Sequence, residues 1–397
     1  MTDKLCLRDL DVGGKRVLVR VDFNVPMDGK RVADDTRIRA ALPTISELIR
    51  GGAKIILVTH LGRPKAFDPN LSTEPLAVAL SKFLGRRVKH IVDCIGVEVE
   101  GVVSELRAGD VLLLENVRFY EEETKNGPEF AGTLASLADL YINDAFGAAH
   151  RAHASTERVT HYFDQCAAGL LMEKEIEYLG KVLHNPERPF VAILGGAKIS
   201  DKIGVIENLL DKVDQLVIGG GMAYTFLKAK GVSIGDSIVE YDKLDLANAL
   251  LQKASNRNLI ISLPQDHVIG REVDPNTEFQ AISNENIPDG WSGFDIGIET
   301  VAKFGKILDT AKTVMWNGPL GVYEFEQFAK GTLEIAKRVA KSEGVSIIGG
   351  GDCAAAVHRA GVADRITHIS TGGGASLEFL EGKQLPGIEA LTDRGDK

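Results

Sequence analysis

The stretch LGGAKISDK, residues 194–202, follows the apolar run FVAI at residues 190–193 and places two lysines beside a Gly-Gly pair. An apolar run that ends in glycines is typical of a strand leading into a turn. Beyond the turn, apolar residues recur at helical spacing at positions 203, 206, 209, 210 and 213. We therefore expect a helix capped by Ser200 or Asp201, and the stretch predicts one strand-turn-helix unit of an α/β fold.

The lysines suggest what this turn binds. Lys202 would lie in the first turn of the helix, with Lys198 just before it. Lysine there opposes the helix dipole by roughly 0.3–1 kcal/mol, so two lysines are unfavourable unless an anion also binds. The stretch lacks the phosphate-loop pattern G-x-x-x-x-G-K-[ST]. A phosphate site is favoured, and lysines that simply point to water remain the alternative.

Short β-branched runs alternate with helical stretches along the chain, which favours parallel sheets with crossover helices. We expect strands at 17–21, 54–59, 88–92, 111–114, 140–142, 190–194, 215–218, 259–262, 313–316, 346–348 and 367–369. Residues 172–189 are polar with apolar residues at helical spacing, and they predict a connecting helix. A chain of 397 residues is expected to form two domains of about 150–200 residues each.

The two halves of the chain differ in the residues at the ends of their strands. In the second half the strands run into glycines, at 195–196, 219–221, 349–351 and 372–374. In the first half the strand ends and adjoining segments carry polar and cationic residues: Asp22, Asn24, Arg37, His60, Arg63, Arg118, His150 and Arg151. Ligands of open α/β sheets bind outside the carboxyl ends of the strands. The first half should therefore bind a small anion, and the second a phosphate-bearing ligand that the backbone can approach closely.

Two carboxylates of the second half have candidate roles. Asp352 stands at an expected helix cap, where it would repel a phosphate unless Mg²⁺ joined the two; an ordinary cap is the alternative. Glu324 could accept hydrogen bonds from ribose hydroxyls, or it could be a surface glutamate. His150 and His153 have too few partners for a metal site, and a structural role for them stays open.

Composition excludes several classes of protein. The net charge of -10 argues against nucleic-acid binding, which requires a basic surface. No apolar run approaches the roughly 20 residues that span a bilayer, and the first ten residues have no hydrophobic signal core, so we expect a cytoplasmic protein with no membrane partner. The four cysteines are widely separated and should be reduced.

Long motifs along the chain resemble those of the phosphoglycerate kinase family. They are VRVDFNVP, VTHLGRP, LLENVRFY, NDAFGAAHRAHAS, LGGAKISDKI, IGGGMAYTFL, WNGPLGVYE, GGGDCAAAV and STGGGASLEFLEGKQLPGIEAL, in family order from about residue 7 to 392. The resemblance implies two Rossmann-like three-layer α/β domains with parallel sheets around a cleft, joined by a helix and hinge. It implies a triose domain at 1–172, a linker at 173–188, a nucleotide domain at 189–375, and a segment at 376–397 that packs back on the first domain.

The resemblance also implies the site residues and the reaction. The triose ligand, 3-phosphoglycerate or 1,3-bisphosphoglycerate, would contact Asp22, Phe23, Asn24, Arg37, His60, Leu61, Gly62, Arg63, Arg118 and Arg151. The nucleotide, ADP or ATP, would contact Gly196, Lys202, Gly220, Gly293, Glu324, Gly350, Gly351, Asp352 and Cys353, with Mg²⁺ on Asp352. Arg37 and Lys198 would act on the phosphoryl group in flight, assisted by Lys202 and by backbone groups of Gly373 and Gly374. We expect a monomer that closes its cleft for catalysis.

Two residues depart from the family pattern. Many relatives have threonine in place of Cys353, and an aliphatic residue often stands in place of Phe294. Both changes should affect nucleotide affinity more than the type of reaction. A dehydrogenase is a rival interpretation, but the glycine runs lack the G-x-G-x-x-G spacing. A two-domain solute-binding protein is another, and it would normally carry an export signal.

Overall fold

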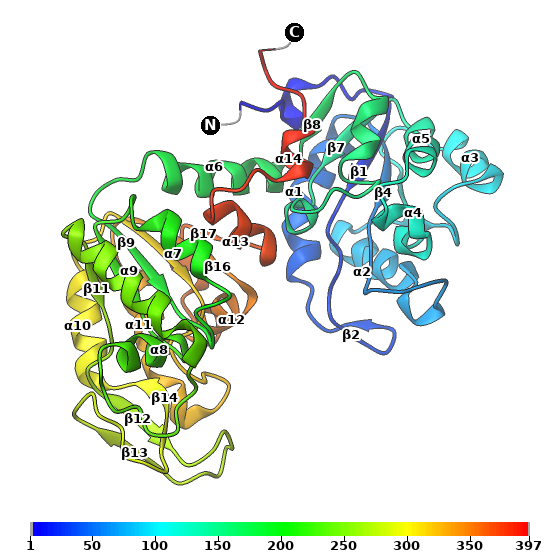
Figure 1. Ribbon diagram of the computed structural model, residues 1–397. Helices are drawn as coiled ribbons and strands as arrows, with labels where there is room; N and C mark the ends of the chain where they lie inside the picture. The colour runs from blue at the N-terminus through cyan, green and yellow to red at the C-terminus, as the bar shows by residue number, and fades with distance from the viewer. Residues whose placement is uncertain (1–2, 396–397) are drawn as a thin grey trace. The chain divides into compact units, whose positions relative to one another are not determined.

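The computed structural model describes residues 3–395, and they form two compact units. Unit 1 contains the described residues up to Glu177 together with those from Gln384 onward, and unit 2 runs from Tyr178 to Lys383. Each unit is an α/β sandwich in which helices flank a six-stranded sheet (Figure 1). All neighbouring strands of both sheets pair in parallel, which confirms the predicted fold class.

The sheet of unit 1 has the strand order β5-β6-β4-β1-β7-β8. Its strands are β1 (Arg16–Arg20), β4 (Lys54–Val58), β5 (Val88–His90), β6 (Val111–Leu113), β7 (Leu140–Asn143) and β8 (Cys166–Ala168). Its helices are α1 (Thr36–Arg50), α2 (Glu74–Leu84), α3 (Val97–Ser104), α4 (Glu121–Thr124), α5 (Pro128–Ser136) and α14 (Pro386–Glu389). Strand β1 comes first in the sequence and lies in the interior of the sheet, so later strands are added on both sides of it.

The main sheet of unit 2 has the order β11-β10-β9-β15-β16-β17. Its strands are β9 (Phe190–Leu194), β10 (Gln215–Ile218), β11 (Ile260–Ser262), β15 (Thr313–Asn317), β16 (Val345–Gly349) and β17 (His368–Ile369). Its helices are α7 (Ile203–Leu209), α8 (Met222–Ala229), α9 (Leu244–Asn256), α10 (Ile298–Leu308), α11 (Lys330–Lys341), α12 (Gly351–Arg359) and α13 (Gly374–Leu380). All five residues of β9 and of β15 are buried, as expected for central strands covered by helices on both faces.

The strand order of unit 2 reverses its direction between β9 and β15. In sequence numbering this sheet reads 3-2-1-4-5-6, the doubly wound arrangement in which ligands bind at the point of reversal. The segments that leave β9 and β15 are 195–202 and 318–324, so the topology brings LGGAKISDK beside the WNGPLGVYE stretch. The backbone of Gly196 donates to Pro319 O at 2.9 Å across this point.

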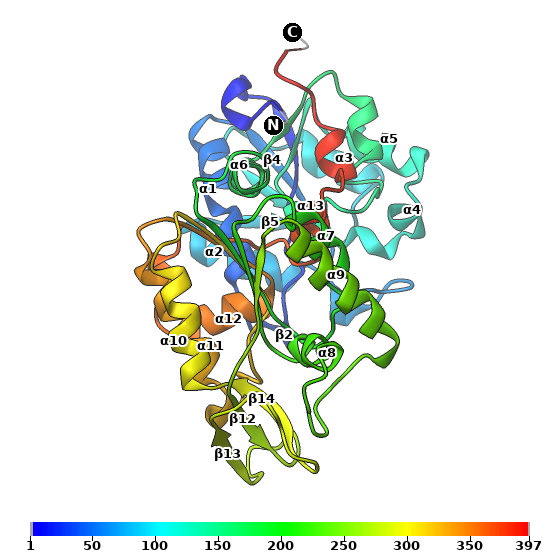
Figure 2. The same cartoon turned by 60° about the vertical axis from the view of Figure 1, so that its left-hand side comes forward.

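Three elements of the structure were absent from the sequence prediction. They are strand β8, the hairpin of β2 (Met27–Asp28) and β3 (Arg31–Val32), and an antiparallel sheet of β12 (His267–Gly270), β13 (Phe279–Ile282) and β14 (Ser292–Ile296). Figure 2 shows this small sheet below the main sheet of unit 2. Strand β8 reads Cys-Ala-Ala and has no β-branched residue, while β13 is largely exposed and lacks the apolar alternation of a half-buried strand.

The chain crosses from unit 1 to unit 2 within helix α6 (Leu170–His184), close to the predicted connecting helix. The structure groups residues 376–383 with unit 2, whereas the sequence prediction assigned 376–397 to the first domain. The reason is that α13 packs on α7: Asn208 Nδ2 donates to Leu380 O at 2.6 Å.

The segment after Gln384 belongs to unit 1 and is held by the N-terminal residues. Lys4 is buried, and its ammonium group donates to the carbonyl oxygens of Glu389 (3.1 Å) and Leu391 (2.8 Å) and pairs with Asp393 (2.9 Å). The backbone of Leu5 also donates to Thr392 O at 2.8 Å. Unit 1 is thus completed by residues from both ends of the described chain.

Residues 3–395 contain no helix long and apolar enough to cross a membrane. The cytoplasmic location stays a prediction.

Candidate functional sites

The predicted cations of unit 1 gather at the carboxyl ends of β1, β4, β6 and β7. Arg37, from the first turn of α1, donates to Asp22 Oδ2 at 2.8 Å and to Asn24 O at 3.2 Å. Asn24 in turn accepts from the backbone N–H of Gly62 at 2.9 Å, and Arg118 donates to Gly62 O at 2.6 Å. These bonds join segments that are up to about a hundred residues apart into one framework, so the topology brings these predicted residues together.

Burial and repulsion between neighbouring cations lower the pKa values of two groups in this cluster. Desolvation, followed by the charges of Arg20 and Arg151, lowers the pKa of Arg118 to about 10. Desolvation and then Arg20 hold the pKa of His60 well below its usual value. The Nε of Arg118 is buried and has no hydrogen-bond partner within the described chain. A cation cluster with a donor left over is suited to an anionic ligand that would supply acceptors and opposite charge.

Desolvation also lowers the pKa of His153 to about 4, and Arg118 adds the next largest contribution. His153 is therefore neutral near pH 7, and its Nδ1 lies 3.8 Å from the buried carboxylate of Glu123. A neutral, buried histidine fits the structural role that the sequence left open.

Other predicted residues of unit 1 have different surroundings. Phe23 and Leu61 are buried in the hydrophobic core, so they can meet a ligand only through backbone atoms. Arg63 is exposed, and Arg151 is partly buried with its Nε 3.1 Å from His150 Nε2.

Arg20 was predicted to stand at a strand end, in the stretch 20–24, but it was not among the predicted site residues. Its side chain is buried, contacts His60 Nδ1 at 3.0 Å and donates to Ser155 Oγ at 2.8 Å. Arg20 is the last residue of β1, and its contact with His60 could not be read from the sequence.

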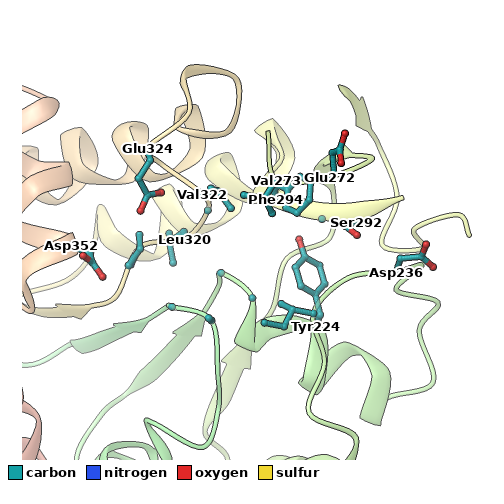
Figure 3. A pocket seen from close by; sticks show the side chains of 18 of the residues that line it. Tyr224, Asp236, Glu272, Val273, Ser292, Phe294, Leu320, Val322, Glu324 and Asp352 are labelled. Carbon is teal, nitrogen blue, oxygen red and sulfur yellow. The ribbon is translucent and has the colours of Figure 1, made fainter. Parts of the chain in front are cut away.

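Unit 2 contains a cavity of about 540 Å³ at the carboxyl edge of its main sheet, lined in part by the segments that follow β9 and β15. This volume lies within the range of about 300–1,000 Å³ that is typical of small-molecule sites. Figure 3 shows Tyr224 pointing into the cavity toward Ser292 and Phe294, with Glu324 and Asp352 at the opposite end. Leu320 and Val322 form the wall between the two ends.

The aromatic side chains thus lie at one end of the cavity, where Asp236 and Glu272 also border it, and Glu324 and Asp352 lie at the other end. Phe294 packs edge-on against Phe328, with ring centroids 5.0 Å apart, so its ring is held in place. An extended ligand with a flat apolar group and a polar, phosphate-bearing tail would match this distribution.

Two predicted glycines are required by close packing in the wall of the cavity. A Cβ at Gly293 would lie 1.9 Å from the hydroxyl oxygen of Tyr224, so only glycine lets the ring take its place. Gly220 has φ +65°, and a Cβ there would lie 2.7 Å from Pro319 O. Of the predicted nucleotide residues, Gly196, Gly220, Gly293, Glu324 and Asp352 line the cavity. Tyr224, Leu320 and Val322 also line it, and the sequence prediction missed them because apolar residues at helix or strand spacing look like core.

The two lysines of LGGAKISDK have different environments. Lys198 is exposed, whereas Lys202 is buried, and burial lowers the pKa of Lys202 while Cys353, Asp201 and Asp352 oppose that shift. The prediction of a Ser200 or Asp201 cap was wrong: α7 begins at Ile203, with Lys202 at the N-cap position and no side-chain cap. Ser200 Oγ donates instead to Glu240 Oε1 at 2.6 Å, because that carboxylate offers a stronger acceptor.

The last predicted residues lie around the start of α12. The cap position there belongs to Gly350, so Asp352 is the second residue of the helix rather than its cap. Its carboxylate is exposed and borders the cavity. Cys353 is fully buried in the core of unit 2, where desolvation raises its pKa to about 12; its thiol is shielded from solvent. Gly373 and Gly374 stand at the start of α13.

The carboxylates of unit 2 fit a magnesium ion that is held mainly by the phosphate groups of a bound ligand. Residues 3–395 contain no cluster of three or more His, Cys, Asp or Glu side chains that could hold a metal. Mg²⁺ commonly takes one or two protein carboxylates and completes its coordination with phosphate oxygens and water. The exposed carboxylate of Asp352, at the same end of the cavity as Glu324, agrees with that mode of binding.

Comparisons with known proteins agree across the chain. The sequence profile of the family described as phosphoglycerate kinase matches residues 7–383. The chain is 57% identical over 392 residues to a phosphoglycerate kinase of Moorella thermoacetica, covering 98% of this chain and 100% of that one. It is 56% identical over 391 residues to the cytosolic phosphoglycerate kinase of Nicotiana tabacum, covering 98% of each.

Solved structures give the same result. The phosphoglycerate kinase of Coxiella burnetii superposes with a TM-score of 0.90 at 42% identity, covering 98% of this chain and 99% of that one. The enzyme of Pyrococcus horikoshii OT3 superposes with a TM-score of 0.86 at 35% identity, covering 98% of each.

Proposed function

Because the chain belongs to the phosphoglycerate kinase family and is an enzyme that transfers a phosphoryl group between 1,3-bisphosphoglycerate and ADP, we propose how its two units divide the reaction. The cation cluster of unit 1 binds the triose, and the cavity of unit 2 binds the nucleotide. The observation that carries this division is the contrast between a buried arginine cluster in one unit and a partly apolar cavity in the other. Family membership also excludes the dehydrogenase and the solute-binding protein.

The reaction requires alignment and positive charge more than proton transfer. A terminal oxygen of ADP attacks the acyl-phosphate phosphorus of 1,3-bisphosphoglycerate, and the bond to the carboxylate oxygen breaks as ATP forms. The leaving carboxylate keeps the electron pair. The nucleophile is the diphosphate oxygen of ADP in the forward reaction and the carboxylate of 3-phosphoglycerate in the reverse reaction. Both are ionised near pH 7, so no general base is needed. What the transition state needs is cations around the equatorial oxygens of the transferred group.

We assign the triose contacts to the framework of unit 1. Arg118, Arg151, Arg63 and His60 face the phosphate and carboxylate of the triose, and Asp22 and Asn24 orient it, with backbone groups of Phe23, Leu61 and Gly62. Arg37 is held by Asp22 at 2.8 Å and is still partly exposed, so it can turn a free donor toward the phosphoryl group in transfer. A bidentate guanidinium suits that task.

The nucleotide contacts belong to unit 2. Gly196, Gly220 and Gly293 let the backbone approach the nucleotide, Glu324 accepts from the ribose, and residues 350–353 offer backbone N–H groups to phosphate oxygens. Lys202 binds the nucleotide phosphates, and Lys198, exposed beside them, meets the transferred phosphoryl group. Gly373 and Gly374 supply further backbone donors.

Mg²⁺, when bound at Asp352 with the nucleotide phosphates, would neutralise charge on the phosphate oxygens. Replacing Asp352 with alanine should raise the Mg²⁺ concentration needed for half-maximal activity. An unchanged Mg²⁺ dependence would leave Asp352 with a structural role only.

Arg37 and Lys198 belong to different units, so transfer requires the two units to bring their ligands together. We also propose that the protein is a monomer. Small-angle scattering of the protein with both substrates, compared with each alone, tests the closure, and light scattering tests the monomer.

The role of Lys198 has a direct test. Lys198→Ala should keep the fold, because the side chain is exposed, and should lower kcat at least ~10²-fold, the usual effect of losing one transition-state donor. The measurement is a coupled assay of ATP formation from ADP and 1,3-bisphosphoglycerate. A near-normal kcat would remove Lys198 from the mechanism.

A further inference from the structure

Glu240 reaches from a distant part of unit 2 to the stretch that carries Lys198. Its Oε2 accepts from the backbone N–H groups of Ile199 (2.7 Å) and Ser200 (3.2 Å), and its Oε1 accepts from Ser200 Oγ at 2.6 Å. One carboxylate thus receives three hydrogen bonds from two consecutive residues that are about forty positions away in sequence. Both residues come directly after Lys198.

The segment around Lys198 is fixed at two points and open between them. At one end, Gly196 donates to Pro319 O at 2.9 Å and accepts from the backbone of Met222 at 3.0 Å. At the other end, Ile199 is fully buried, and Glu240 holds its N–H. Ala197 and Lys198 lie between these points and are exposed. The direction in which the Lys198 side chain leaves the backbone therefore depends on the anchor at Ile199 and Ser200.

Glu240 is itself well placed to serve as that anchor. Its backbone N–H donates to Thr225 Oγ1 of α8 at 3.2 Å, and its backbone is extended, with φ −100° and ψ 91°. The residues two and four positions before it, Ile238 and Asp236, line the nucleotide cavity. The same short segment therefore forms part of the cavity wall and holds the lysine loop against it.

We propose that Glu240 is a positioning residue for Lys198 in phosphoryl transfer. This inference rests on the proposed role of Lys198. Glu240 touches neither substrate. It fixes the backbone on the C-terminal side of Lys198, so that the ammonium group is already oriented toward the phosphoryl group before transfer. A carboxylate near the phosphates is electrostatically unfavourable, so the contribution of Glu240 lies in its geometry rather than in its charge.

Geometry and charge are separable by substitution. In Glu240→Gln the amide oxygen can accept from the two backbone N–H groups, and the amide nitrogen can donate to Ser200 Oγ, so the anchor remains without its charge. In Glu240→Ala all three bonds are lost. A displacement of about 1 Å at a catalytic group can cost about 10²-fold in rate, so we expect Glu240→Ala to lower kcat by roughly 10- to 100-fold. Glu240→Gln should stay within about threefold of the parent enzyme, because its hydrogen bonds are retained.

The experiment is a double-mutant cycle on the full chain. The variants are Lys198→Ala, Glu240→Ala, Glu240→Gln and the double Lys198→Ala/Glu240→Ala, each assayed for kcat and for the KM of ADP and of 1,3-bisphosphoglycerate. If Glu240 acts through Lys198, the double variant has the kcat of Lys198→Ala alone. The KM of the triose should not change. Glu334→Ala, which removes only a surface pair with Lys337, is the matched control.

Each outcome has one meaning. A slow Lys198→Ala beside a normal Glu240→Ala overturns the positioning role and leaves the proposed function intact. Additive losses in the double variant, or a Glu240→Gln as slow as Glu240→Ala, also overturn it. A normal kcat for Lys198→Ala overturns the role of Lys198 itself, and the inference with it.

Hydrogen exchange supplies a readout that does not depend on activity. The amides of Ile199 and Ser200 should exchange faster in Glu240→Ala and keep their protection in Glu240→Gln, and unchanged exchange in Glu240→Ala would overturn the inference. Glu240→Asp, whose carboxylate is one methylene shorter, takes the place of Glu240→Ala in all these measurements should the alanine variant fail to fold.

Discussion

Replacing Gly293 with alanine should weaken nucleotide binding and leave triose binding unchanged. The new Cβ would stand 1.9 Å from the hydroxyl oxygen of Tyr224 and 2.2 Å from its Cζ, where ordinary contact begins at 3.4 Å. The shortfall to the hydroxyl is 3.4 minus 1.9, or 1.5 Å, which is too large for small adjustments of both groups. The Tyr224 ring must move.

The size of the effect depends on where the ring can go. Tyr224 is nearly fully buried and packs against His267, with ring centroids 5.5 Å apart, so the open direction is the cavity into which it already points (Figure 3). Overpacking of this kind typically costs about 1–3 kcal/mol. A ring displaced into the cavity must be pushed back when the nucleotide binds, so that cost appears in the affinity as an increase in Kd of about 5- to 150-fold.

Calorimetric titration of ADP and of 3-phosphoglycerate into the parent and variant proteins measures both affinities. The double variant Gly293→Ala/Tyr224→Leu relieves the overlap, so its Kd for ADP should be close to that of Tyr224→Leu alone. Gly101→Ala is the control, since a Cβ at that exposed position of α3 meets nothing within 4 Å. An unchanged Kd for ADP in Gly293→Ala, or equal losses for both ligands, would refute the reasoning.

Three further predictions concern titration, thiols and the C-terminal segment. The pKa of His153 is lowered from 6.5 to about 4, so the stability that its neutral form contributes is fully present above pH 6.5, and up to about 3 kcal/mol of it is lost as the pH falls from 6.5 through 4. In urea unfolding, the free energy of unfolding of His153→Gln should therefore decline less steeply than that of the parent between pH 6.5 and 4. Parallel curves for the two proteins would contradict this. All four cysteines are buried, and desolvation raises the pKa of Cys6, Cys166 and Cys353 to about 12 and also raises that of Cys94. Ellman's reagent should therefore react with these thiols only after denaturation. A fast-reacting thiol in the native protein would be inconsistent with this burial. Lys4→Met removes the donor to the carbonyl oxygens of Glu389 and Leu391 and should lower the free energy of unfolding by about 1–3 kcal/mol. Trypsin should then cleave faster at Arg394. Cleavage at the parent rate would show that Lys4 does not hold the segment.

All strands of the two main sheets except β8 could be predicted, because buried parallel strands read as continuous apolar runs. Phe190–Leu194, for example, is fully buried and begins and ends where the sequence prediction placed it. Strand β8 could not be found in this way, since Cys-Ala-Ala carries no propensity for a strand and is ordered by β7 beside it. Tertiary packing, rather than local preference, decides such a segment.

In the candidate sites, too, some features could be predicted from the sequence and others depend on tertiary contacts. Side chains at strand ends could be located from sequence because parallel strands share an edge, and Asp22, Arg37, Gly62 and Arg118 do meet there. The environment of Lys198 could not be derived, because its anchor comes from Glu240, about forty residues away, through hydrogen bonds to backbone groups that any sequence would offer. The sequence favoured a cap by Ser200 or Asp201, but the Ser200 hydroxyl donates to the distant carboxylate of Glu240 instead.

The pairing of residues 3–5 with residues near 392 has a consequence for synthesis on the ribosome. Unit 2 is continuous in sequence, from Tyr178 to Lys383, whereas unit 1 needs residues from Gln384 onward to complete its surface. Unit 1 is translated first but is completed last. Until Leu391 and Asp393 leave the exit tunnel, the ammonium group of Lys4 has neither its carbonyl acceptors nor its carboxylate. We expect a released chain that is truncated after Lys383 to show a protease-resistant unit 2 and a unit 1 that is still open to cleavage near its first residues.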